Sequence, residues 1–423
     1  MVAHSPFGSP SFKLVAKGLV ELHRLIIAGK DDSPEAESVR DALDAPLKAL
    51  NATEKTRAQW LSEDLYSVSE PNSGTVQKQM TPQAQCQLNE ALQARQDREW
   101  DRALELLRQW KDYVLPAQLS YLRGSIWLEA GDFAVAAAFY EHASKSDPEN
   151  ANYQAIYMHA LEKSDPPSAW KIAREVLASE EKWAPVVVAR AADIRINETR
   201  DASDAESARV RRELIPALER NLARLEQDQH AASRTSAYAT TAGLLGFCHE
   251  FLENSGAAVT YYSRGLQVKP KEDGLLVARG ILLYGTSPRA ITDLEQAASL
   301  GSPVVWPYLF LAHHYLATSR FEQCRAMCET GLRMHASDTA KSQLEEWRAI
   351  AQAELGFSPD AVRAAFEAAV RLDPSNEVAK RNQDAFEASL RVLPARPHSK
   401  WERESEAAVR QFGLAERRYS FAA

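Results

Sequence analysis

The chain has 423 residues, of which 45% are hydrophobic and 26% are charged, and its formal net charge is −8. These values are typical of a folded protein with an apolar core, and the acidic balance argues against a nucleic-acid-binding surface. Four scattered cysteines do not make a disulfide framework, and no run of about 18 apolar residues predicts a transmembrane helix. We therefore expect a cytoplasmic protein without membrane insertion.

The N-terminal part, residues 12–69, is predicted to be a separate helical segment, with helices over 12–28, 35–49 and 53–67. Ser33-Pro34-Glu35 is a helix start, because proline fits the first helical turn and acidic side chains favour it. Polar residues with Pro and Gly follow, and residues 70–83 are expected to be a linker.

Two later stretches share one spaced pattern of small and aromatic residues, which indicates internal repeats. The stretch Ala117 to Asn150 and the stretch Ala239 to Glu272 each place a Pro 24 residues after a Gly (148 − 124 and 270 − 246). The residues at the shared offsets are Gly124, Trp127, Ala136, Tyr140, Ala143 and Pro148 in the first, and Gly246, His249, Ala258, Tyr262, Gly265 and Pro270 in the second.

A unit of about 34 residues with these offsets resembles the tetratricopeptide repeat, a helix–turn–helix hairpin. Gly124 and Ala136 are small enough for two antiparallel helices to approach closely, and Tyr140 is expected to fill the space between neighbouring hairpins. Pro148 removes an N–H donor and ends the second helix. The alternative is an irregular α-bundle with accidental periodicity, which two units matching at five or more offsets disfavour.

Weaker copies of the pattern extend the resemblance to an array over residues 84–376. Degenerate hairpins are expected at 151–182 and 273–301, and a further helix pair at 184–196 and 205–229. Residues 377–423 then supply a capping helix, a linker and a charged terminal helix at about 400–417. The resemblance implies an all-α fold, an α-solenoid (a right-handed superhelix) of tetratricopeptide-like hairpins with extra helices at both ends.

Signatures of catalysis and of metal or cofactor binding are missing from the sequence. It has no phosphate-binding glycine loop, no H-E-x-x-H, no C-x-x-C and no G-x-S-x-G. His313, His314, Cys324 and Cys328 are the nearest approach to a metal site, but the repeat register places both cysteines in the hairpin core, where cysteine behaves as a small apolar residue. We expect no catalytic residues, no metal and no cofactor, and hence no enzyme.

The resemblance also implies where a partner binds, because in this family the first helix of each hairpin lines the concave face. The candidate partner-binding residues are Tyr121, Ser125, Leu128, Phe247, Glu250, Phe251, Trp306, Leu309 and His313. Aromatic residues on a groove wall suit an amphipathic helix or an extended peptide. The alternative is that Phe247, Phe251 and Trp306 pack between hairpins.

Two functions are compatible with these residues. The first is a non-enzymatic scaffold or adaptor that binds a protein or peptide partner in the concave groove. The second is a regulatory or sensor module whose terminal helices, from 12–69 or 400–417, occlude the groove until a partner displaces them. The sequence leaves open the identity of the partner, the pathway and the oligomeric state, because one fold serves many functions.

Overall fold

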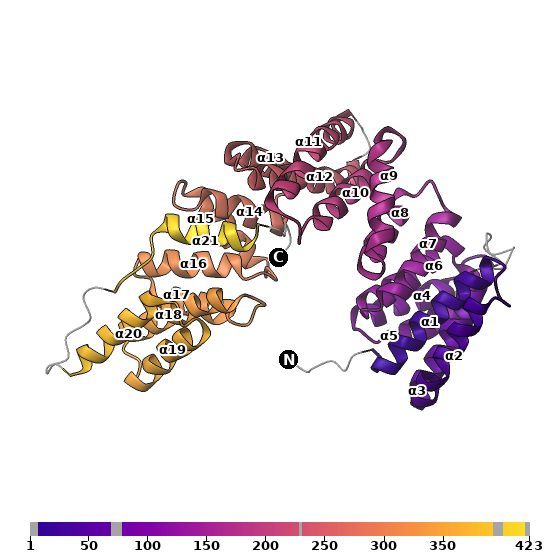
Figure 1. Cartoon of the computed structure of the whole chain (residues 1–423), viewed down its shortest axis with the longest axis horizontal. Helices are drawn as coiled ribbons and strands as arrows, with labels where there is room; N and C mark the ends of the chain where they lie inside the picture. Colours follow the sequence, from indigo (N-terminus) through magenta and orange to yellow (C-terminus); the bar gives the residue numbers. More distant parts are fainter. Residues whose placement is uncertain (1–6, 69–77, 228–230, 392–400, 419–423) are drawn as a thin grey trace. The chain divides into compact units, whose positions relative to one another are not determined.

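The computed structural model describes residues 7–68, 78–227, 231–391 and 401–418, with only the backbone described at 231–234 (Figure 1). Within these ranges every regular element is a helix, which confirms the predicted all-α solenoid. The predicted linker at 70–83 lies outside the described residues up to position 77, and so does the linker before the terminal helix, at 392–400. The chain divides into two compact units, one ending at Glu198 and the other beginning at Thr199.

The described residues of unit 1 form ten α-helices, and most of these helices pack against the next one in the sequence. They are α1 (Pro10–Ile27), α2 (Pro34–Ala49), α3 (Ala52–Ser67), α4 (Pro82–Gln96), α5 (Trp100–Gln109), α6 (Pro116–Glu129), α7 (Phe133–Ser146), α8 (Ala151–Ser164), α9 (Pro166–Ala178) and α10 (Pro185–Glu198). Two short 3-10 turns, Lys111–Tyr113 and Glu180–Lys182, lie between hairpins. Several of these helices start after a polar residue whose side chain caps the first turn. For example, the Ser33 hydroxyl accepts a hydrogen bond from the Ala36 N–H at the start of α2.

The N-terminal helices share one hydrophobic core with the first repeats. Phe12 of α1 stacks on Trp127 of α6, with ring centroids 6.2 Å apart. The Asp64 carboxylate of α3 accepts a hydrogen bond from the Arg123 guanidinium of α6 over 2.8 Å, and both side chains are buried. A buried pair of this kind fixes the position of α3 on α6, because separating it would leave a charge buried without a partner.

The two strong repeats form hairpins in which glycine makes room for tyrosine. A Cβ at Gly124 of α6 would lie 2.8 Å from Cε1 of Tyr140 on α7, so only glycine fits there. Tyr140 therefore packs inside its own hairpin, against Gly124 and Tyr121, and its contact with a neighbouring hairpin stays a prediction. Gly131 at the turn has φ +84°, a conformation that glycine adopts at little cost.

The described residues of unit 2 form eleven α-helices around an extended hydrophobic core. They are α11 (Asp204–Gln227), α12 (Ala231–Phe251), α13 (Ser255–Val268), α14 (Asp273–Leu283), α15 (Arg289–Ser299), α16 (Trp306–Ala317), α17 (Phe321–Gly331), α18 (Asp338–Glu354), α19 (Pro359–Leu372), α20 (Glu377–Leu390) and α21 (Glu406–Glu416). The strong repeat of this unit is the hairpin of α12 and α13, where Tyr262 packs over Gly246.

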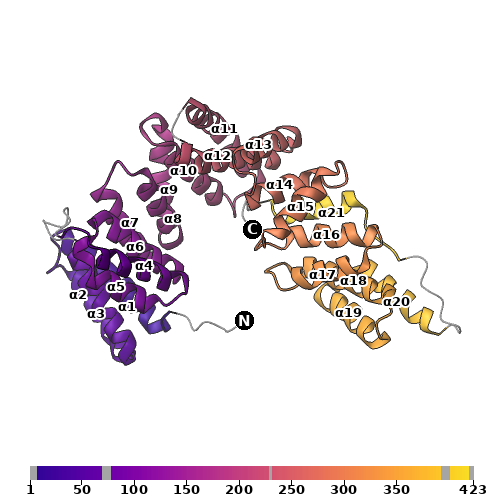
Figure 2. The ribbon, with the colours of Figure 1, turned by 180° about the vertical axis from the view of Figure 1, so that it is seen from behind.

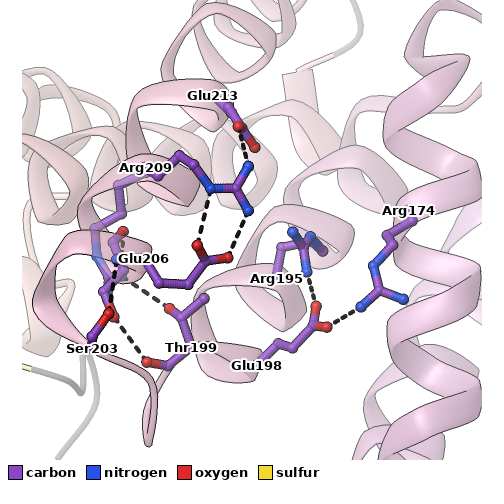
Figure 3. A network of polar contacts seen from close by, with 10 residues as sticks. Arg174, Arg195, Glu198, Thr199, Ser203, Glu206, Arg209 and Glu213 are labelled. Atoms are coloured by element: carbon purple, nitrogen blue, oxygen red, sulfur yellow. Dashed lines mark hydrogen bonds and ion pairs between the residues drawn. The ribbon is translucent and has the colours of Figure 1, made fainter.

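Polar networks fix the end of α10 and the start of α11 (Figure 3). In unit 1, the Glu198 carboxylate accepts hydrogen bonds from Arg174 of α9 and Arg195 of α10. In unit 2, Arg209 of α11 bonds Glu206 over 2.6 Å and Glu213 over 2.5 Å. The two pairs of Arg209 are exposed and lie one helical turn apart on α11, so solvent screens them and they contribute little to stability.

The terminal helix α21 begins later than the sequence indicated. It starts at Glu406 rather than near residue 400, because the Ser405 hydroxyl caps it by accepting from the Ala408 N–H. Both views of the ribbon show α21 beside α14 and α16, and it contacts both helices (Figures 1 and 2). The chain therefore returns from α20 to the first helices of earlier hairpins in the same unit.

Candidate partner-binding surface

The three candidate residues in unit 1 lie on α6 around a cluster of tyrosines. The Tyr121 ring is half-buried and lies 5.8 Å from the Tyr140 ring and 5.3 Å from the Tyr153 ring of α8. The Ser125 hydroxyl is buried, donating to the Tyr121 carbonyl and accepting from the Tyr140 hydroxyl. Leu128 is half-buried against the core. Partner contact at these three residues stays a prediction.

The six candidates in unit 2 come from two helices, with Phe247, Glu250 and Phe251 on α12 and Trp306, Leu309 and His313 on α16. The structure buries five of them, with exposed fractions between 0% and 6%, and the side chain of the sixth, Glu250, is 7% exposed. The C-terminal segment, defined here as residues Trp401–Arg418, contacts Glu250, Trp306 and His313 directly. Side chains predicted to meet a partner thus meet a helix-bearing segment of the same chain.

Helix α21 binds this surface through an aromatic contact, a buried ion pair and a close approach at glycine. Phe412 packs edge-on against Trp306, with centroids 6.3 Å apart. The Arg417 guanidinium lies 3.3 Å from the Glu250 carboxylate, and only 2% and 7% of the two side chains are exposed. A Cβ at Gly413 would lie 2.6 Å from the Phe310 ring of α16, so a larger residue cannot take that position without displacing the ring or the helix.

The non-helical part of the C-terminal segment, Trp401 to Ser405, is held by its main chain. Asn382 of α20 donates from its side-chain amide to the Glu402 carbonyl over 3.0 Å and accepts from the Glu402 N–H over 2.9 Å. His313 bonds the Glu404 carbonyl over 2.9 Å, while its other ring nitrogen lies 2.7 Å from the Tyr284 hydroxyl. Because a carbonyl only accepts, Nε2 of His313 carries the proton and Nδ1 accepts from Tyr284. Main-chain bonds of this type would hold any sequence in the same conformation.

Side chains of the repeat array also contact side chains of the C-terminal segment. Arg381 of α20 makes two hydrogen bonds to the Glu402 carboxylate, at 2.6 and 2.7 Å. Trp347 Nε1 donates to the Glu404 carboxylate over 3.3 Å. Trp401 Nε1 donates in turn to Glu354 of α18, and the Trp401 ring lies 6.1 Å from the Phe366 ring. These contacts involve one tryptophan and two acidic side chains of the segment.

A buried carboxylate, Glu346 of α18, lies under this part of the segment. Its two oxygens accept hydrogen bonds from Asn382 over 2.8 Å and from Asn376 over 3.3 Å. Burial, and next to it the negative charge of Glu404, raises the pKa of Glu346 to about 8. Burial likewise lowers the pKa of His313, which therefore stays neutral at neutral pH.

A pocket of about 340 Å³ remains between α21 and the array. Its walls on the array side include Phe247, Phe251 and Leu282, and α21 contributes Leu414 and Ala415 to the other side. The guanidinium of Arg418 lies over the Phe251 ring, 4.7 Å from its centroid. The fit of α21 to this surface is therefore incomplete on the side of α12.

Sequence reasoning missed the residues that hold the non-helical segment, namely Asn382, Trp347 and Trp401. The lone tryptophan in the charged run "SKWERESE" was a usable signal, because an aromatic side chain isolated among charges needs an apolar contact to explain it. Asn382 lies beyond the repeats in a polar helix and gives no such signal.

In the part of the chain that the structure describes, no three His, Cys, Asp or Glu side chains are grouped so that they could hold a metal ion. Cys324 and Cys328 are fully buried in the core of unit 2, as the repeat register predicted. The described helices include none that is long and apolar enough to cross a bilayer.

Three comparisons with known proteins were informative to different degrees, and only that with solved structures found matches. No family model matches the chain, and no curated protein matches it at a significant level. The solved structures similar to it include the hetero-tetramer Cut9–Hcn1 of the APC/C, at 14% identity and a TM-score of 0.31, covering 86% of this chain and 92% of that chain. They also include the tetratricopeptide domain of P58(IPK), at 16% identity and a TM-score of 0.21, covering 81% of this chain and 79% of that chain.

The chain resembles tetratricopeptide repeat proteins. Its own hairpins carry that resemblance, through the paired contacts of Gly124 with Tyr140 and of Gly246 with Tyr262 at equal spacing.

Proposed function

We propose that the chain is a non-enzymatic protein-interaction scaffold, and that the surface of α12, α14, α16, α18 and α20 in unit 2 binds a segment of a partner protein. One observation carries this proposal. The C-terminal segment occupies that surface as a peptide ligand would, with its main chain bonded to Asn382 and His313 and its helix docked by Phe412 and Arg417.

The same observation favours a regulatory form of this function. The C-terminal segment covers Trp306 and Glu250, so a partner that uses these residues must displace it. A segment tethered to the protein competes at an effective concentration on the order of millimolar, so a free ligand of equal affinity binds only weakly. The scaffold is then closed by default and opened by a partner with higher affinity for the surface.

The test uses a labelled peptide with the sequence of residues 401–418 and the full-length protein. A Gly413→Leu substitution in the protein unseats its own α21 on Phe310 while leaving the surface unchanged. We expect the peptide to bind this variant at least tenfold more tightly than it binds the wild type, as measured by fluorescence anisotropy. Ala408→Leu, an exposed change on the same helix, is the matched control and should bind the peptide as the wild type does.

A peptide that itself carries Gly413→Leu should not bind any of the three proteins. If the native peptide fails to bind the Gly413→Leu protein, and that protein retains its helical circular dichroism, the surface is not a peptide site and the proposal is wrong.

A further inference from the structure

We infer that the partner presents a segment with the pattern of Trp401–Arg418 but with a large apolar residue where this chain has Ala415, and that this residue fills the pocket beside α12. The inference rests on the proposed function, and it specifies the chemistry of the partner.

The surface sets three requirements for any segment that occupies it. The Phe310 ring requires a small residue at the Gly413 position, and the buried Glu250 carboxylate requires a cation at the Arg417 position. Asn382 and His313 require a main chain that enters the helix from a non-helical stretch. These requirements define an amphipathic helix that follows a non-helical stretch, with a small residue on its buried face and a cation at its end.

The C-terminal segment does not fill the pocket beside α12. The pocket of about 340 Å³ is lined on the array side by Phe247, Phe251 and Leu282 together with polar residues such as Glu253 and Ser255, and α21 contributes Leu414, Ala415 and Gln411. Ala415 and Gln411 are exposed, so they bury little of the apolar wall. A leucine at the Ala415 position adds three carbon atoms that can cover this wall beside Leu414, which strengthens binding about tenfold or more.

The chain's own segment is thus a suboptimal ligand beside α12. A segment that can be displaced by a better-fitting one is what the regulatory form of the function requires.

The experiment compares three peptides of residues 401–418 on the full-length Gly413→Leu protein: the native sequence, Ala415→Leu and Ala408→Leu. The two substitutions add the same atoms to the same helix, but only position 415 lines the pocket. We expect the Ala415→Leu peptide to bind at least tenfold more tightly than the native peptide, and the Ala408→Leu peptide to bind within twofold of it. Equal affinities for the two leucine peptides would overturn the inference.

The outcomes separate the inference from the proposed function. If the native peptide binds and Ala415→Leu brings no gain, the surface is a peptide site but the pocket does not select the partner. If no peptide binds the folded variant, both proposals fail. A measurement in the intact protein gives an independent check, because Ala415→Leu in the full chain should slow hydrogen exchange of the α21 amides at least tenfold relative to Ala408→Leu. Equal exchange in these two variants would also contradict the inference.

Discussion

Removal of the Arg417 guanidinium should release α21 from unit 2. Arg417 and Glu250 are 3.3 Å apart and almost fully buried, so Arg417→Ala leaves the Glu250 carboxylate buried without its cation. Breaking a buried ion pair from one side costs about 3–5 kcal/mol. Glu250 also accepts a hydrogen bond from the Tyr262 hydroxyl over 2.7 Å, which places the cost near the lower limit, about 3 kcal/mol.

The cost applies only while α21 is docked, because Glu250 is solvated once the helix leaves. A change of about 3 kcal/mol corresponds to a factor of about 100 in the docking equilibrium. Hydrogen exchange measures this equilibrium directly, since the amides of α21 exchange from the undocked form. We expect the α21 amides of Arg417→Ala to exchange about 100-fold faster than those of the wild type, with no change in the amides of α6 and α7 in unit 1.

Arg410→Ala is the matched control, because Arg410 lies within α21 and Arg417 is the residue that follows its last turn. Arg410 is half-buried and makes a 3.2 Å hydrogen bond to the Tyr284 carbonyl, so its loss costs only about 1 kcal/mol. Exchange of α21 should then be accelerated less than tenfold. If Arg417→Ala changes the exchange of α21 by less than threefold, the ion pair does not hold the helix and the reasoning from its burial is refuted.

Two further predictions concern the folding of unit 2. Gly246→Ala should destabilise it by about 1–3 kcal/mol, because the new Cβ would lie 2.5 Å from Cδ1 of Tyr262. Gly256→Ala should cost far less, because its Cβ would meet nothing within 4 Å. Chemical denaturation of the two variants measures the difference in their free energies of unfolding. The pKa of Glu346 is raised in the folded state, so folding takes up a proton between about pH 4.5 and 8, and stability should fall as the pH rises through this window. Glu404→Gln should weaken this pH dependence of stability, which is measured as the difference between the melting temperatures at pH 5 and pH 8. An unchanged difference would show that Glu404 does not raise the pKa of Glu346.

Much of the fold could be predicted because its determinants are local. A glycine facing a tyrosine within one hairpin leaves a mark at a fixed spacing, and Gly124 with Tyr140 and Gly246 with Tyr262 repeat it. Proline and serine at helix starts mark boundaries in the same way, as at Ser33 and Pro34. The register of the repeats also placed Trp306 and His313 on α16, and both side chains contact the C-terminal segment.

The occupant of that surface could not be read in the same way. His313 bonds the Glu404 carbonyl across 91 positions of the sequence, and no local pattern records such a contact. The charged residues near position 400 suit a helix, so the sequence predicted one, but Asn382 binds the Glu402 main chain and Ser405 caps a later helix start.

By itself, then, the sequence determined the repeating hairpins, because close packing of neighbouring helices requires particular residue sizes at short, fixed separations. Only the tertiary structure decided that the segment from Trp401 to Arg418 lies on α12, α16 and α20. That choice depends on hydrogen bonds to main-chain atoms and on a buried ion pair between distant helices, and main-chain atoms are the same in every sequence.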